Sequence, residues 1–127
     1  MRNVINWFEI YVDDFERAKK FYATVFKCPV QNLPTNNERH SQMKYATLGD
    51  PAEDGGICGA LVKLDVAKPG VGGTLVYFNS EEINAELERV EAAGGRVVRH
   101  KQNVGDLGFI ALIEDTEGNM IGLHSNK

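Results

Sequence analysis

The side chains best suited to chemistry in this chain are a carboxylate, Glu9, and an imidazole, His124, each set in a strand-like run of alternating residues. A carboxylate in aromatic surroundings has a raised pKa and can act as a general base, with His124 or Tyr77 as its acid partner. The same strand faces carry further stacking and hydrogen-bonding side chains, namely Trp7, Tyr11, Tyr77 and Asn79. The set suits proton abstraction next to a carbonyl, or binding of a polar or cationic small molecule.

Strand parity predicts where these side chains point. Residues 8, 10 and 12 are apolar and should face a helix, so Glu9 takes the opposite face together with its aromatic neighbours. The runs 75–79 and 120–124 alternate in the same way. If two curved sheets face each other, Glu9 should sit in a partly apolar cavity beside Trp7 and Tyr11, with Tyr77 and His124 entering from the second half.

Each of these residues also has a purely structural interpretation. Glu9 suits an exposed sheet face, His124 suits a solvated strand end, and the tyrosines suit packing with water on their hydroxyls. His40 falls in a polar stretch that we expect to be a loop, and His100 ends a strand pattern at an exposed position. These alternatives stay open at the level of the sequence.

The elements that position the candidate residues occur twice along the chain. Each half has a strand, a helix pattern and a hairpin pattern: residues 7–12, 15–26, 43–48 and 57–63, then 75–79, 81–93, 109–114 and 120–124. Such a repeat predicts an α+β fold of two modules whose half-sites meet in one cleft. We expect one domain over residues 1–127, with module 1 at about 1–66, a linker at about 67–73 and module 2 at about 74–127.

The sequence marks where each of the two expected helices begins. Asp13 is the expected cap of the first helix, with Glu16 completing a capping box, and Ser80 is the expected start of the second. Gly94 and Gly95 supply a left-handed stop.

Two polar stretches lack a clear period. Residues 31–42 read as a connection that acts as a lid over a cavity mouth, and the basic residues 96–101 read as a solvated turn.

Composition excludes several functional classes. The chain has 127 residues, 43% hydrophobic content and a net charge of -4, which argues against general nucleic-acid binding. We expect no membrane span and no secretory signal, and therefore a cytoplasmic protein. Cys28 and Cys58 form no zinc-ligand pattern and are expected to be free thiols, with Cys58 a small buried residue rather than a nucleophile.

Several stretches together resemble one known family. They are residues 8–14 running into 16–22, residues 90–95, and the ending Asp115-Thr116-Glu117-Gly118-Asn119-Met120-Ile121-Gly122-Leu123-His124. These resemble the vicinal oxygen chelate superfamily, which groups glyoxalase I, extradiol dioxygenases and bleomycin-resistance proteins, and within it the glyoxalase-like proteins of unassigned activity. The resemblance covers nearly the whole chain. It implies paired βαβββ modules with curved mixed sheets enclosing a cleft, and a homodimer.

The departures from that family concern its metal. Metal-dependent members carry His, Gln or Glu ligands on four strands, and the corresponding positions here are Trp7, Gly59 or Ala60, Leu75 and Gly122. None of these side chains donates a lone pair to a divalent cation, and Glu9 with His124 would be too few donors for a displaced site. We therefore expect no metal and no cofactor.

Three functions remain. The first is a metal-free small-molecule binding protein of the glyoxalase and bleomycin-resistance type. The second is a metal-independent lyase or isomerase in which Glu9 is the general base and His124 or Tyr77 the acid. The third is a dimerising domain whose cleft has no ligand; an apolar, collapsed cleft would favour it.

Overall fold

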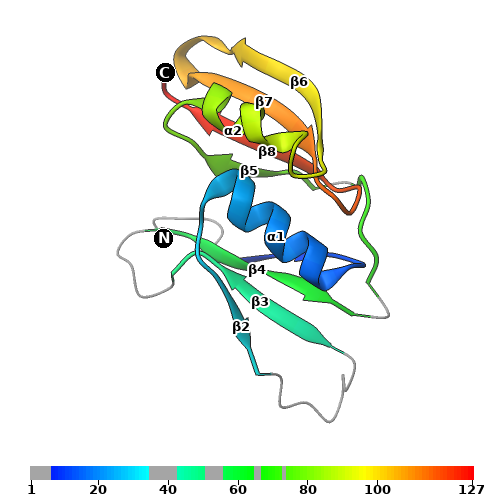
Figure 1. Cartoon of the computed structure of the whole chain (residues 1–127). Coiled ribbons are helices and arrows are strands. Elements are labelled where there is room, and N and C mark those ends of the chain that lie inside the picture. The colour runs from blue at the N-terminus through cyan, green and yellow to red at the C-terminus, as the bar shows by residue number, and fades with distance from the viewer. Residues whose placement is uncertain (1–6, 35–42, 51–55, 65–66, 73) are drawn as a thin grey trace.

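The computed structural model describes residues 7–34, 43–50, 56–64, 67–72 and 74–127. Two open four-stranded mixed sheets, each with one helix packed on it, make up the molecule (Figure 1). The elements are β1 (Trp7–Tyr11), α1 (Phe15–Phe26), β2 (Val30–Leu33), β3 (Lys44–Leu48), β4 (Cys58–Lys63), β5 (Val76–Asn79), α2 (Ile83–Val90), β6 (Arg96–Asn103), the short 3-10 helix η1 (Gly105–Leu107), β7 (Phe109–Glu114) and β8 (Met120–Ser125). The expected fold of paired βαβββ modules is confirmed.

The two sheets have the same strand order. The first runs β1-β4-β3-β2 and the second β5-β8-β7-β6, and in each the first strand of the module lies parallel to the last. The remaining neighbours are antiparallel. This register places Glu9 beside Ala60 and Asn79 beside His124, so it decides which side chains share a face.

Helix α1 forms because apolar residues recur at three- and four-residue spacing and bury one face. The buried set is Phe15, Ala18, Phe21, Tyr22 and Val25. The N-cap is Asp14, whose carboxylate accepts the Arg17 amide at 3.0 Å, so the expected cap at Asp13 was wrong by one residue. The helix ends at Phe26, and its C-cap Lys27 has a left-handed φ of 53°.

Helix α2 is shorter than its sequence pattern suggested. It is capped by Glu82 rather than Ser80, since Ser80 instead continues β5 by donating its amide to the His124 carbonyl at 2.8 Å. Gly94, with φ of 100°, forms part of the turn after it, as expected.

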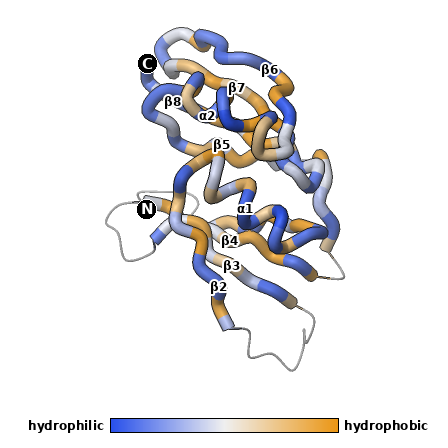
Figure 2. Tube along the Cα trace, in the orientation of Figure 1, coloured by the Kyte–Doolittle hydropathy of each residue, from blue (hydrophilic) through white to orange (hydrophobic). Residues whose placement is uncertain are grey.

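Two edge strands were missed by the sequence analysis. β2 falls in the expected connection, and β6 replaces the expected basic turn. Both are mostly exposed and lack the alternation that marks a half-buried strand. β6 is also mostly polar, as its hydrophilic colour beside hydrophobic β7 illustrates (Figure 2). His100 is exposed on β6, as expected. The remainder of the proposed lid, residues 35–42 including His40, lies outside the described residues.

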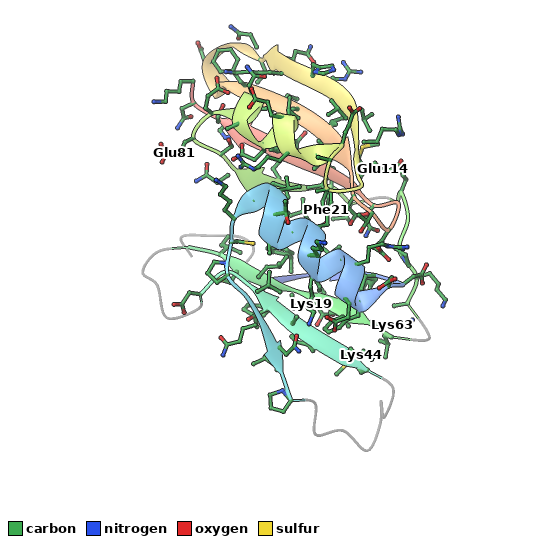
Figure 3. The ribbon with its side chains drawn as sticks, viewed as in Figure 1. Lys19, Phe21, Lys44, Lys63, Glu81 and Glu114 are labelled. Atoms are coloured by element: carbon green, nitrogen blue, oxygen red, sulfur yellow. The ribbon has the colours of Figure 1, made fainter. Side chains whose placement is uncertain are left out.

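Helix α1 lies between the first sheet and β5 of the second module (Figure 1). Its Phe26 ring stacks on Phe78 with centroids 4.4 Å apart, and Phe8 meets the same ring edge-on at 5.8 Å. Phe21 lies on the side of α1 toward the second module, where its ring packs so closely on Gly95 that a Cβ there would lie 2.6 Å from it (Figure 3). One continuous core therefore joins the two modules.

The turn between β7 and β8 holds the start of α1 through a single carboxylate. Glu117 Oε1 accepts the amides of Asp13 and Asp14 at 2.9 and 2.7 Å, and Oε2 accepts Arg17 Nε at 2.8 Å. Burial alone would raise the pKa of Glu117, but hydrogen bonds from Arg17, from the two amides and from Thr116 outweigh it and lower the pKa to about 2.

Further contacts fix the middle and the last turn of α1 and the end of β1. The buried Tyr22 hydroxyl donates to Asp115 at 2.7 Å, and Asn119 Nδ2 donates to the Tyr11 carbonyl at 2.9 Å. At the other end of α1, Arg89 donates Nε and Nη2 to the Val25 carbonyl at 3.0 and 2.7 Å. The second module thus positions the strand that carries Glu9.

Candidate functional site

On the first sheet, a carboxylate is held by two phenols on the face opposite α1. Glu9 Oε1 accepts the Tyr11 hydroxyl at 2.9 Å and Oε2 accepts the Tyr45 hydroxyl at 2.9 Å. Trp7 Nε1 donates to the Tyr45 oxygen at 3.1 Å, which completes a chain from indole to phenol to carboxylate. Trp7, Glu9, Tyr11 and Tyr45 are called the Glu9 cluster below.

Parity and register explain the Glu9 cluster. Phe8 turns into the core and lies over Gly59, so Glu9 and its neighbour Ala60 face the other way. Ala60 and Val62 on β4 are fully buried although they face away from the core, because they lie beneath side chains from β1 and β3.

The carboxylate of Glu9 contributes to a raised pKa of both tyrosines in the Glu9 cluster. The hydrogen bond to Glu9 raises the pKa of Tyr11, and burial, with a further contribution from Glu9, raises the pKa of Tyr45. Both phenols therefore stay protonated at neutral pH and keep donating to Glu9.

The second sheet carries a cavity of about 590 Å³ on its own face. Its lining is Tyr77, Asn79, Val104, Ile110 and His124, called the Tyr77 cavity below. His124 lies between Asn79 on β5 and Ile110 on β7, so all three share one face. The Tyr77 ring lies against Gly122, where a Cβ would come within 2.4 Å of it.

The structure brings the six residues expected in one site together in two groups. Trp7, Glu9 and Tyr11 meet in the Glu9 cluster, where Glu9 is exposed, whereas Tyr77, Asn79 and His124 line the Tyr77 cavity. Within the described residues, the lining of that cavity includes no member of the Glu9 cluster. A single site containing all six stays a prediction.

Sequence reasoning did not single out three residues of these groups. Tyr45 had a usable signal, because in the expected strand 43–48 it alternates with the apolar Ala46 and Leu48. Ile110 lacked this signal, because residues 109–113 are all apolar. Val104 had none, since it follows β6 in a loop and approaches the cavity only through the tertiary fold.

The residues at the family's metal-ligand positions do not fit a metal. Parity now assigns Ala60, not Gly59, to the face of Trp7, and Ala60 has no donor atom. At Gly122 the Tyr77 ring occupies the space that a ligating side chain would need. Among the described residues, no three His, Cys, Asp or Glu side chains are grouped so as to hold a metal ion.

The two cysteines differ in position: Cys58 lies beside Trp7 of the Glu9 cluster in the register of β1 and β4, whereas Cys28 follows α1. Cys28 and Cys58 are unpaired and partly buried. Cys28 Sγ contacts the Tyr22 carbonyl at 3.8 Å, and burial raises the pKa of its thiol, which opposes a nucleophilic role.

Comparison with known proteins agrees with the fold. A model of the glyoxalase/bleomycin resistance protein/dioxygenase superfamily matches residues 4–123, so the chain belongs to that superfamily. In the described part of the chain, neither helix has the length and apolar character needed to cross a membrane.

Relatives and solved structures extend this comparison. A putative glyoxylase, CFP32, of Mycobacterium tuberculosis is 26% identical over 93% of this chain, which spans only 44% of that relative. A glyoxylase-like domain-containing protein of Didymella fabae is 28% identical, with 91% of this chain and 88% of the relative covered. TnmS3, an antibiotic binding protein from Streptomyces sp. CB03234, superposes with a TM-score of 0.68 at 22% identity, covering 98% and 97% of the two chains.

Proposed function

We propose that this chain is a metal-free small-molecule binding protein of the glyoxalase and bleomycin-resistance type. The observation that carries the proposal is the Tyr77 cavity, whose 590 Å³ falls in the range of about 300–1,000 Å³ typical of small-molecule sites. Val104 and Ile110 supply apolar surface, while Asn79 and His124 supply a few polar groups. A structural neighbour that binds an antibiotic is in keeping with this use of the fold.

A second copy of the chain is part of the proposal. Both sheets are open, and the second exposes Leu75 and Tyr77, which are 38% and 47% accessible on or beside β5. Exposed apolar side chains on an open sheet suit coverage by another subunit. We therefore propose a homodimer whose clefts are completed across the interface.

The enzymatic alternative requires Glu9 and His124 to act on one substrate. Glu9 is oriented by two phenols, as a general base should be, but His124 lines a cavity whose described lining does not include Glu9. Binding is therefore the function that the arrangement favours. Turnover of a carbonyl substrate that is lost in Glu9→Gln while binding is retained would instead establish the lyase or isomerase function.

Native mass spectrometry and metal analysis of the protein purified without denaturation test the proposal directly. We expect no stoichiometric metal, and a co-purified small molecule would identify the ligand class. Chemical-shift mapping with a library of aromatic fragments then locates binding, which we expect at the amides around Tyr77 and His124.

A pair of matched variants makes that test specific. Ile110→Trp fills the Tyr77 cavity and should abolish fragment binding, whereas Val98→Trp adds the same bulk on exposed β6, outside the lining, and should not. Fragments that bind Ile110→Trp as well as the unmodified protein, or that perturb neither module, would refute the proposed function.

A further inference from the structure

We propose that the Glu9 cluster binds an organic cation, an amine or quaternary ammonium group carried by a larger ligand. The inference rests on the proposed function, because it assigns a ligand class to one part of the binding surface.

The first argument is the charge of Glu9. Its two oxygens accept hydrogen bonds from Tyr11 and Tyr45, which are neutral donors and leave the negative charge in place. Within the described residues, no lysine or arginine forms an ion pair with Glu9. A carboxylate offers about four lone-pair positions, so acceptor capacity remains for a ligand. The exposed, uncompensated charge favours a cation and disfavours an anion.

The second argument is the aromatic surround. The indole of Trp7 and the phenols of Tyr11 and Tyr45 are tied to Glu9, or to each other, by hydrogen bonds of 2.9 to 3.1 Å. Aromatic faces next to a carboxylate attract ammonium groups through the ring quadrupole. A divalent metal would need several more oxygen or nitrogen donors, so the cluster suits an organic cation instead.

The third argument is preorganisation. Tyr45 on β3 and Glu9 on β1 lie on either side of β4, and their side chains meet across it in a hydrogen bond of 2.9 Å. The chain from Trp7 through Tyr45 orients the carboxylate before any ligand arrives. A ligand therefore binds without the cost of ordering these side chains.

Fluorescence of the full chain provides the test, because Trp7 is its one tryptophan. The probes are benzyltrimethylammonium, neutral benzyl alcohol and anionic benzoate, titrated separately at low salt. We expect a saturable change with benzyltrimethylammonium, and affinities weaker by about tenfold or more for the other two.

Variants separate local contact from general charge attraction. Glu9→Gln keeps the volume, removes the charge and should weaken benzyltrimethylammonium binding by about tenfold. Glu81→Gln removes an equal charge at an exposed position just before α2 in the second module (Figure 3) and should leave the affinity unchanged. Tyr45→Phe keeps the ring but removes a donor to Glu9, and we expect an intermediate loss.

The remaining outcomes would overturn the inference. Equal binding of benzyl alcohol that Glu9→Gln does not weaken would leave a neutral binding site and keep the proposed function. Equal losses in Glu9→Gln and Glu81→Gln would show only long-range attraction. If no probe produced a saturable change, the cation site would be absent, while fragment mapping of the Tyr77 cavity would still decide the proposed function.

Discussion

At the scale of single residues, Glu117 is the group whose charge matters most to the fold. Its carboxylate is fully buried and accepts two amides and the Arg17 guanidinium at the start of α1. Removing the charge would leave the half-exposed Arg17 guanidinium and two backbone amides with a weaker acceptor. Because this turn also holds β1 through Asn119, stability and the placement of Glu9 depend on the same segment.

The pH dependence of stability should reveal this carboxylate. Its pKa in the folded chain is about 2, below the ordinary 4.5, so its contribution is complete above pH 4.5 and is lost as the pH falls toward 2. A shift of this size corresponds to about 3 kcal/mol. We expect urea denaturation to show Glu117→Gln less stable at pH 6 and less sensitive to acid between pH 5 and 2, with Glu81→Gln as the unaffected control. Parallel pH profiles for the unmodified protein and Glu117→Gln would contradict the assignment.

Gly122 is a second residue that matters at this scale, because Tyr77 leaves no space for a side chain there. An added Cβ would lie 2.4 Å from the Tyr77 ring, so Gly122→Ala must displace that ring. Forcing extra volume into such a contact costs about 1–3 kcal/mol. We expect Gly122→Ala to lower the melting temperature and Tyr77→Ala to relieve part of that effect in the double variant. Additive losses would mean that the two positions do not interact.

At the scale of elements, α1 is the part that joins the modules. Its start is bound by the turn at residues 115–119, its middle packs on Phe78 and Gly95, and its end is bound by Arg89. A helix fixed at both ends by the other module moves with that module. The two sheets are therefore held in one relative arrangement, and so are the Glu9 cluster and the Tyr77 cavity.

Arg89 offers a direct test of this connection. Arg89→Met keeps most of the side-chain bulk but leaves the Val25 carbonyl without its two donors, 3.0 and 2.7 Å away. We expect a loss of about 1–3 kcal/mol in the free energy of unfolding. Arg96→Met removes only an exposed pair with Glu114 and should cost less than about 1 kcal/mol. Equal losses in the two variants would refute a special role for Arg89.

At the scale of the whole molecule, the open sheet faces decide the expected assembly. Leu75 and Tyr77 remain accessible beside a cavity that a single chain leaves open. Sedimentation velocity at micromolar concentration should show a dimer, because covering these faces removes apolar surface from water. A monomer under these conditions would contradict the proposed homodimer.

The metal content of the whole molecule is the second global prediction. Ala60 has no donor and Gly122 is covered by Tyr77, so a chelator should change neither the melting temperature nor ligand binding. Metal analysis after native purification checks the same point. Stoichiometric metal bound by Glu9 or His124 would show that the ligand assignment is wrong.

Periodicity in the sequence was enough to determine much of this protein. The alternation in residues 7–12 placed Phe8 and Glu9 on opposite faces, and the repeated order of elements predicted the paired modules. The helical stripe of α1 was likewise readable, since burial of one face follows from residue spacing alone. Each of these properties is local, and a local pattern specifies which way a side chain points.

Only the tertiary structure decided which side chains meet. The hydrogen bond from Tyr45 to Glu9 depends on the order of β1, β4 and β3 in the sheet. The spacing of residues within one strand cannot predict it. The cap at Asp14 rather than Asp13 follows from Glu117, more than a hundred residues away, which takes both amides. Tyr77, Asn79 and His124 line one cavity because partners across strands are fixed by register.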